Sequence, residues 1–469
     1  MKIAIFGVGL IYQRNKYLFK NYQVEYIIDN AEAKQGSLID GMIISAPNEV
    51  DYDKCSYIII MVQHYDEIRK QLLDLGVSED KIVPYTRLGE LLDQRVLVYE
   101  KNGQLELEEW LSKKISCHQK IVMIFSHELS YSGVPVALLN LAKILKTMGY
   151  IVILAGLSAD TFEYEIQKEE IDYINNLEIF YEGKKFLELV NRIDFFIAGT
   201  LVLSRLVSVI AMLEKPVMWW IHESDRVLYD KVKLVDVPKN VHIYTGGSRV
   251  KEMVHKRWHN VPTKELLYFI PDWNGKSLVR AEKNKVVFAI IGFICSRKGQ
   301  DIFLDAVISL PEKYREQMEI IMIGKSSAAE KKYISSVETK LSLLPEVKRI
   351  GVLSQEKLEN YFEELDVLVC ASRDDPMPIV VTQAMMHRKT CIISDNVGQC
   401  EFVRQKENGF VFHNEDSQEL AQYIMWLIDN RQLLDVMGRN ARRVYENYFS
   451  EECMRKNIKH MLEDLVGGH

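Results

Sequence analysis

Short apolar runs alternate with segments of helical spacing along the whole chain. Val286–Gly292, Asp366–Cys370 and Thr390–Ser394 are largely apolar without polar alternation, as expected of strands buried on both faces of a parallel sheet. The segments between such runs, for example Gln300–Leu310 and Gln355–Glu364, repeat their apolar residues at helical spacing. This alternation of buried strands and helices predicts an α/β protein with parallel sheets.

The same pattern divides the chain into three α/β regions. We expect a small Rossmann-like domain at 1–95, a charged linker with one helix at 96–119, and two larger Rossmann-like lobes at 120–280 and 281–469. Further strands are expected at 2–6, 24–29, 57–62, 121–125, 150–155, 194–200, 216–221, 241–248, 320–324, 347–352 and 410–412. Further helices are expected at 66–75, 105–114, 135–148, 201–213, 249–258, 328–343, 379–386 and from 417 onward.

Length, charge and cysteine usage narrow the classes of function. The 469 residues are too many for a single hydrophobic core, so several domains are expected. The formal net charge of -7 argues against a general nucleic-acid-binding protein, whose binding surface would be basic. The seven cysteines form no Cys-x-x-Cys pair, which argues against a zinc site or a disulfide framework and fits a reducing cytoplasm.

We expect neither an export signal nor a membrane span. Met1 leads directly into the first strand, and the longest apolar region, Phe195–Ile221, is interrupted by Arg205, Glu214 and Pro216. A cytoplasmic protein is therefore expected, with a peripheral position at the inner face of the membrane left open.

The first strand is followed by a turn of the dinucleotide-binding kind. Gly7 and Gly9 form a Gly-x-Gly turn, and Asp29 ends the next strand twenty residues later, at the distance of a ribose-binding acid. The third glycine position holds Tyr12, which obstructs close packing of helix on strand. The domain resembles small N-terminal domains of bacterial sugar-modifying enzymes that hold a nucleotide or nucleotide-sugar. A structural or docking role is the alternative.

A loop with two acids and two prolines leads into the apolar helix expected at 379–386. Asp375-Pro376-Met377-Pro378 follows a buried strand, so the helix begins at the carboxyl end of the sheet. Free backbone N–H groups and the helix dipole favour an anion there, typically a phosphate. The alternative is a capped strand-to-helix turn whose acids only satisfy the helix end.

Three further strand ends carry candidate functional residues. Gly133 permits a close backbone approach before the helix at 135–148, and His222 follows the strand at 216–221. Arg297 and Lys298 lie where a loop meets a helix and suit a diphosphate. A surface-loop histidine and a solvated basic turn are the structural alternatives.

Taken together, residues 120–450 resemble the retaining glycosyltransferases of the two-Rossmann-domain (GT-B) type, family 4. Five markers occur in the family's order at expected strand ends: Ser132-Gly133, Trp219-Trp-Ile-His-Glu223, Arg297-Lys-Gly299, Asp374-Asp-Pro-Met-Pro378 with Gln383-Ala-Met385, and Gly398-x-x-Glu401.

The resemblance implies a nucleotide-sugar, with a UDP-sugar the first expectation, between the two lobes. The family places two glutamates eight positions apart, the first near the sugar hydroxyls and the second near the ribose. Here these positions are Asp375 and Gln383, and Phe293 stands where an arginine is frequent. The neutral Gln383 weakens a ribose hydrogen bond by about 1 kcal/mol.

The resemblance also implies a mechanism without a metal or other cofactor. Arg297, Lys298 and the helix N-terminus would neutralise the leaving diphosphate. His222 would lie near the reaction centre, and Asp375 would fix the sugar. The donor-binding set expected is Gly133, Arg297, Lys298, Asp375, Pro376, Met377, Pro378, Gln383 and Glu401.

The expected function is sugar transfer to a glycan or lipid-linked acceptor, in bacterial surface polysaccharide synthesis. A weakly active or inactive scaffold subunit of a transferase complex is the alternative that Gln383 and Phe293 keep open. A third interpretation is an NAD-dependent sugar oxidoreductase or epimerase, in which the first domain binds the dinucleotide. Tyr12 at the third glycine position argues against it.

Overall fold

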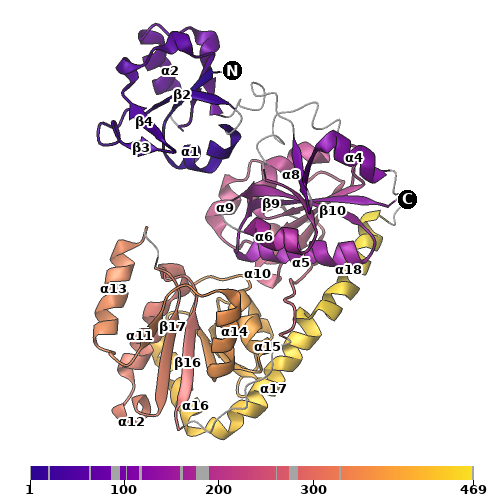
Figure 1. The fold of residues 1–469 in the computed structure, drawn as a ribbon. Helices are drawn as coiled ribbons and strands as arrows, with labels where there is room; N and C mark the ends of the chain where they lie inside the picture. Colours follow the sequence, from indigo (N-terminus) through magenta and orange to yellow (C-terminus); the bar gives the residue numbers. More distant parts are fainter. Residues whose placement is uncertain are drawn as a thin grey trace. The chain divides into compact units, whose positions relative to one another are not determined.

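The structure is a computed structural model that describes residues 2–19, 22–62, 65–85, 96–101, 103–115, 119–158, 162–175, 190–259, 261–273, 284–326 and 329–466 (Figure 1). These residues form two compact units. The first unit comprises 1–131 and 149–194, and the second comprises 132–148 and 195–469.

The N-terminal sheet of the first unit has strand order β3-β4-β2-β1-β5-β6 and is parallel except for the β3–β4 hairpin. Its elements are β1 (Lys2–Phe6), α1 (Leu10–Asn15), η1 (Lys16–Phe19), β2 (Gln23–Ile28), β3 (Leu38–Ile39), β4 (Met42–Ser45), η2 (Pro47–Glu49), η3 (Tyr52–Lys54), β5 (Tyr57–Ile60), α2 (Tyr65–Asp74), η4 (Glu79–Lys81) and β6 (Ile82–Pro84). Apolar side chains from both faces of β1 and β5 are buried, as predicted for central parallel strands.

The rest of the first unit contains strands in the order β9-β10-β11-β7-β8. Its elements are β7 (Leu97–Glu100), β8 (Gly103–Glu106), α4 (Leu107–Ile115), β9 (Ile121–Leu129), β10 (Ile151–Ser158), α6 (Phe162–Lys168) and β11 (Asp172–Ile174). The predicted linker helix is present, but the linker also contains the antiparallel β7–β8 hairpin, which pairs with β11 and was not predicted. β9 also continues to Leu129, past residue 125 where the predicted strand ends.

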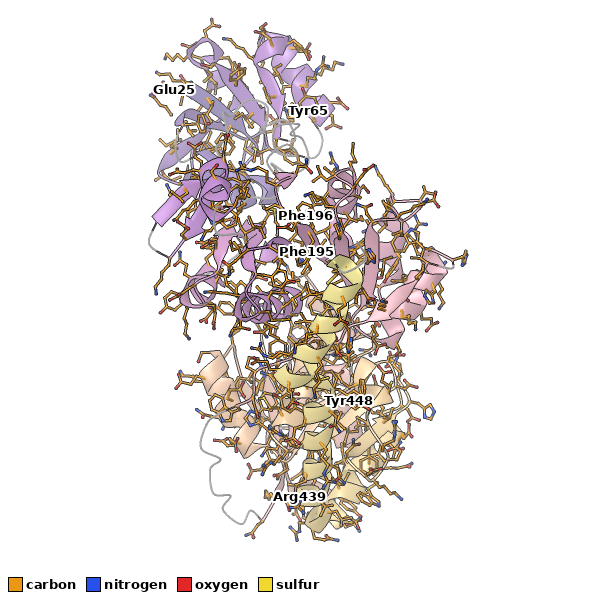
Figure 2. All side chains as sticks on the ribbon, turned by 90° about the vertical axis from the view of Figure 1, so that its right-hand side faces the viewer. Glu25, Tyr65, Phe195, Phe196, Arg439 and Tyr448 are labelled. Atoms are coloured by element: carbon orange, nitrogen blue, oxygen red, sulfur yellow. The ribbon has the colours of Figure 1, made fainter. Side chains whose placement is uncertain are left out.

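The second unit begins with helix α5 and continues with four parallel strands in the order β15-β14-β13-β12. Its first elements are α5 (Gly133–Thr147), β12 (Phe195–Gly199), η7 (Leu201–Leu203), α8 (Ser204–Ala211), β13 (Val217–Ile221), α9 (Arg226–Lys231), β14 (Val241–Thr245), α10 (Ser248–Arg257) and β15 (Thr263–Glu265). Phe195 and Phe196, labelled in Figure 2, are fully buried at the start of β12. The strands end at one edge, where His222 and Gly246 follow β13 and β14.

A six-stranded parallel sheet of order β18-β17-β16-β19-β20-β21 forms the other part of this unit. Its elements are β16 (Val286–Ile291), η8 (Ser296–Lys298), α11 (Gln300–Ser309), α12 (Glu312–Arg315), β17 (Met318–Ile323), α13 (Lys331–Ser342), β18 (Lys348–Ile350), α14 (Gln355–Glu364), β19 (Val367–Cys370), α15 (Ile379–Met386), β20 (Thr390–Ser394), η9 (Gly398–Glu401), β21 (Gly409–Phe412), α16 (Ser417–Asp429), η10 (Arg431–Leu433) and α17 (Leu434–Val444). Helices α11, α13 and α16 cover one face, and their apolar residues form a single core with the strands (Figure 1).

The end of the chain returns to the first part of the second unit. The π-helical turn η11 (Tyr445–Phe449) leads into α18 (Glu451–Val466), drawn in yellow in Figure 1. The Tyr445 hydroxyl donates to the Ile270 carbonyl at 3.0 Å, and Arg455 of α18 contacts Thr147 of α5 at 2.9 Å. The Tyr244 hydroxyl of β14 donates to Asp464 of α18 at 3.4 Å, so the return helix contacts both α5 and β14.

The α/β class predicted from the sequence is confirmed by these parallel sheets. The boundaries predicted at residue 95 and between residues 280 and 281 lie outside the described residues, so the predicted domain division stays a prediction. The six cysteines in the described ranges are free thiols. None of the helices in those ranges combines the length and the apolar character that crossing a bilayer requires.

Candidate functional site

The turn that carries Arg297 and Lys298 packs directly on the end of β19. Gly299 closes this turn with φ of 66°, a left-handed conformation that favours glycine. A Cβ atom on Gly299 would lie 1.9 Å from the Ala371 carbonyl oxygen, so any side chain would push the turn away. This close approach places the two cations beside the loop that follows β19.

Lys298 and Asp375 form an ion pair at this edge of the sheet. The Lys298 ammonium contacts Asp375 Oδ2, and Arg297 Nη1 lies 3.5 Å from the same oxygen. Arg297 Nη1 also donates to the Asp374 carbonyl at 2.9 Å. The side chains of Lys298 and Asp375 are 18% and 9% exposed, so the pair is largely removed from water.

The loop from Asp375 to Pro378 is held against η9. The N–H of Gly398 donates to the Asp375 carbonyl at 2.9 Å, and a Cβ on Gly398 would lie 1.6 Å from the Pro376 carbonyl oxygen. The Gln399 amide donates to the Pro378 carbonyl at 2.8 Å. Pro378 itself is the extended residue before α15, which therefore begins with the free N–H groups that an anion needs.

Two glycines from other elements lie against the start of α15. A Cβ on Gly133, the first residue of α5, would be 3.8 Å from Ile379 Cδ1. A Cβ on Gly247, after β14, would be 2.8 Å from Met377 Cε. The Gly133 turn predicted from the sequence is thus beside the first turn of α15.

Asp374 links this loop to the strand ends of β13 and β14. Its two carboxylate oxygens accept the Ser224 hydroxyl at 2.9 and 3.0 Å, and one of them lies 3.4 Å from Arg249 Nη2. Arg249 Nη1 also contacts Asn396 Oδ1 at 3.1 Å. Asp374, Ser224 and Arg249 were not predicted as functional residues, although each lies next to a predicted motif.

His222 lies after β13 with its imidazole packed on Trp220, the ring centroids 4.4 Å apart. Burial lowers the pKa of His222 to about 3, so the ring is neutral at physiological pH. Its Nε2 is buried and has no hydrogen-bond partner among the described residues. A neutral ring with an unsatisfied nitrogen is suited to a hydrogen bond with a ligand.

The two acids that follow His222 in its loop bind other groups and not its imidazole ring. Glu223 Oε1 contacts the Thr200 hydroxyl, and Oε2 accepts from the N–H groups of Leu201 at 2.9 Å and of His222 at 3.1 Å. Asp225 caps α9 through the Val227 N–H. These acids fix the loop around His222 and leave its imidazole to other partners.

Glu401 ends η9 and has one buried oxygen, Oε1, without a hydrogen-bond partner among the described residues. Burial and the nearby Glu265 raise the pKa of Glu401, while hydrogen bonds from Ser248 act in the opposite direction. Its contacts connect it with the start of α10 rather than with Lys298.

Gln383 is held by a residue of α14. Its Nε2 lies 3.4 Å from Glu359 Oε1, and the other oxygen of Glu359 contacts Nε2 of His387. Nδ1 of His387 lies 2.8 Å from Glu363 Oε1. This pairing was not predicted, because α14 and α15 are brought together only by the packing of the sheet.

The Gly7–Gly9 turn of the N-terminal sheet is hydrogen-bonded to Asp29, the acid expected to bind a ribose. Asp29 Oδ2 accepts the Val8 N–H at 3.0 Å and lies 2.9 Å from Lys34 Nζ. Burial alone would raise the pKa of Asp29, but these hydrogen bonds outweigh it and hold the pKa below its usual value. Tyr12 is buried in the core, so helix α1 packs without the third glycine.

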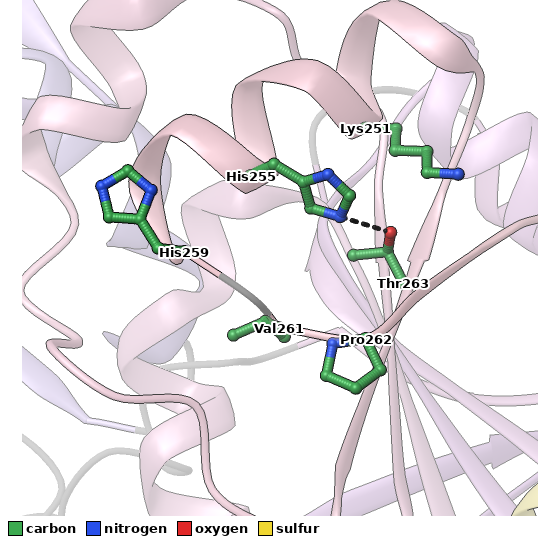
Figure 3. A pocket seen from close by; sticks show the side chains of 6 residues that line it. All are labelled: Lys251, His255, His259, Val261, Pro262 and Thr263. Atoms are coloured by element: carbon green, nitrogen blue, oxygen red, sulfur yellow. Dashed lines mark hydrogen bonds between the residues drawn. The ribbon is translucent and has the colours of Figure 1, made fainter.

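A separate pocket of about 500 Å³ lies at the C-terminal end of α10 (Figure 3). It is lined by Lys251, His255, His259, Val261, Pro262 and Thr263. None of the predicted site residues lines it. In the described ranges no group of three or more His, Cys, Asp or Glu side chains is arranged to hold a metal.

Three protein-family models match consecutive parts of the chain. The model "Glycosyl transferases group 1" matches residues 274–444, and "Glycosyl-transferase family 4" matches residues 118–290. The model "C2185-like, N-terminal" matches residues 1–83.

Curated relatives cover only part of this chain. An uncharacterised glycosyltransferase of Methanocaldococcus jannaschii is 24% identical over 199 residues, which are 41% of this chain and 48% of the relative. The UDP-Gal:alpha-D-GlcNAc-diphosphoundecaprenol alpha-1,3-galactosyltransferase of Escherichia coli is 20% identical over 191 residues, which are 41% of this chain and 49% of the relative. The chain thus spans about half the length of the curated relatives it matches.

Solved structures share the fold over about three quarters of the chain. Anabaena HepE in complex with UDP-glucose has a TM-score of 0.62 at 16% identity, covering 74% of this chain and all of that one. The sucrose-phosphate synthase of Thermosynechococcus elongatus has a TM-score of 0.59 at 16% identity, covering 75% of this chain and all of that one.

Proposed function

The chain belongs to the group 1 glycosyltransferases with the GT-B fold, and we propose that it transfers a sugar from a nucleotide-sugar to a glycan or lipid-linked acceptor. The nucleotide-sugar we propose is a UDP-sugar, as bound by HepE. The lipid-linked alternative for the acceptor is suggested by the name of the Escherichia coli relative. We place the reaction in bacterial surface polysaccharide synthesis, in the cytoplasm or at the inner face of the membrane.

One observation carries this proposal. Lys298 and Arg297 converge on Asp375, which stands just before the N-terminus of α15, so two cations lie beside the start of a helix whose first N–H groups lack intrahelical partners. A leaving diphosphate is stabilised by such an arrangement, because its negative charge grows as the bond to the sugar breaks. The acid at the same point is suited to the hydroxyl groups of the sugar.

In the absence of a donor, Asp375 balances the charge of Lys298. When a diphosphate binds, the ammonium gains a more highly charged partner, and the Asp375 carboxylate becomes available to accept hydrogen bonds from the sugar. This exchange keeps both buried charged groups hydrogen-bonded before and after binding, which limits the cost of desolvation.

His222 acts in this proposal as a neutral hydrogen-bonding group. With a pKa of about 3 it cannot serve as a general acid at neutral pH. Its buried Nε2 can orient the sugar or steady positive charge that develops at the anomeric carbon. We propose a retaining reaction without a metal, in which the acceptor hydroxyl attacks from the face that the diphosphate leaves and the departing diphosphate oxygen takes up the proton of that hydroxyl.

The proposal is tested by incubating the protein with a panel of UDP-, GDP- and ADP-sugars and measuring release of the nucleoside diphosphate. We expect turnover with at least one donor, a loss of at least about 100-fold in Lys298→Ala, and no loss in the surface control Lys239→Ala. Near-normal turnover in Lys298→Ala would contradict the assigned phosphate role. Nucleotide binding without turnover for any donor and acceptor would favour the scaffold alternative.

A further inference from the structure

Four polar residues form a largely buried network around Gln383. Gln383 and His387 lie four positions apart at the end of α15, and Glu359 and Glu363 lie four positions apart on α14. Residues at this spacing share one face of a helix, so the two pairs meet across the helix contact. Glu359 contacts both Gln383 and His387, whereas Glu363 contacts only His387 of the two.

Water has little access to this network. Gln383, Glu359 and His387 are 5%, 4% and 8% exposed. Phe362 stacks on the His387 ring with the centroids 5.3 Å apart. Because buried polar groups must find partners within the protein, the orientation of each group is set by its neighbours.

The chemistry of Glu359 decides which way the Gln383 amide faces. An ionised carboxylate accepts hydrogen bonds and donates none, so it binds the amide NH₂ and repels the amide oxygen. The nitrogen and oxygen of an amide lie on opposite sides of its carbon. With Nε2 directed at Glu359, Oε1 is therefore directed away from it.

We propose that Glu359 positions Gln383 so that its Oε1 accepts a hydrogen bond from a ribose hydroxyl of the nucleotide. This inference rests on the proposed function and on the family resemblance, which implies a ribose near residue 383. A free glutamine could present either its NH₂ or its oxygen to the ribose. Because Glu359 binds the NH₂ group, only the oxygen of Gln383 is left for the ribose. Gln383 then accepts a hydrogen bond, as the family's glutamate would at this position.

Glu359→Gln tests the inference, because a glutamine at 359 can donate as well as accept and no longer fixes the amide. Calorimetry would compare the nucleoside diphosphate that binds the wild type most tightly, among UDP, GDP, ADP and CDP, with its 2′,3′-dideoxy analogue. We expect affinity for the first ligand to fall about 3- to 10-fold. Affinity for the dideoxy ligand should not change, since it has no ribose hydroxyl to donate.

Two further variants separate positioning from general support of the fold. Glu363→Gln alters the same helix and the same histidine without contacting Gln383, and we expect it to leave both affinities unchanged. The exchange Glu359→Gln/Gln383→Glu restores one acid and one amide in contact, and it should return affinity to within about twofold of the wild type.

Three results would overturn the role of Glu359: an unchanged affinity in Glu359→Gln, equal losses for both ligands, or failure of the folded exchange variant to recover binding. An equal loss in Glu363→Gln would overturn it as well. A wild type that binds none of the four nucleoside diphosphates would instead contradict the proposed function.

Discussion

Single residues of the candidate site differ in whether they have partners: two oppositely charged side chains form an ion pair, whereas one buried nitrogen lacks a hydrogen-bond partner among the described residues. Lys298 and Asp375 neutralise each other, whereas the buried Nε2 of His222 has no partner among the described residues. A buried polar atom without a partner costs about 1–3 kcal/mol, so a ligand that supplies the missing hydrogen bond gains affinity.

The ionisation of His222 gives a prediction for pH dependence. Its pKa is about 3 in the folded protein and near 6.5 in an unfolded chain. The unfolded state therefore binds more protons below about pH 6.5, and the stability that His222 contributes at neutral pH is lost progressively as pH falls from about 6.5 toward 3.

NMR titration of the histidine side chains measures this directly. We expect one imidazole signal, absent in His222→Gln, to keep the chemical shift of the neutral ring down to about pH 5. A transition of that signal near pH 6.5 would show that the ring is hydrated and would remove the basis for its assigned role.

At the scale of elements, the strand-to-helix loops place the site. The glycines at 299 and 398 lie so close to neighbouring carbonyl groups that a side chain would displace the Lys298 turn or the α15 loop. The sequence predicted both loops, because each joins a buried apolar strand to a helix. The family resemblance singled out Asp375, which contacts Lys298, whereas the contact of Asp374 with Ser224 was not predicted, since it depends on how two separate loops fold together.

The end of α15 contains a strained residue that gives a prediction for stability. Arg388 adopts φ of 58° at the position after the helix cap, where glycine is usual. Its side chain is exposed. We expect Arg388→Gly to stabilise the protein by about 1 kcal/mol, because a residue with a Cβ is strained in this conformation.

Arg388→Ala provides the matched control, since it removes the same side chain but keeps the Cβ. Chemical unfolding of the wild type and the two variants should show a higher free energy of unfolding for Arg388→Gly alone. An equal increase for Arg388→Ala would attribute the effect to the arginine side chain instead of the backbone.

At the scale of the whole molecule, the sequence predicted the class and most of the central strands. Buried parallel strands such as β16 and β20 are recognisable because both of their faces are apolar. The hairpins β3–β4 and β7–β8 were missed, since short, partly exposed strands lack that signal. Contacts between distant elements, such as Glu359 with Gln383, depend on the packing of the sheet and leave no local pattern.

The contact between Ser224 and Asp374 joins the end of β13 to the loop before α15, and it can be measured by a double-mutant cycle. We expect Ser224→Ala and Asp374→Asn each to lower kcat/KM for the donor and to be coupled by about 1 kcal/mol. Additive effects, like those expected for Ser224→Ala combined with the distant surface change Glu338→Gln, would show that the contact does not contribute to turnover.

Lys298 and the N-terminus of α15 are proposed to bind the diphosphate of a nucleotide-sugar. Calorimetric titration of UDP and of uridine into the wild type and Lys298→Ala measures this role. We expect the variant to bind UDP at least about tenfold more weakly and its affinity for uridine to be unchanged. Equal UDP affinities for the two proteins would show that Lys298 does not bind the diphosphate.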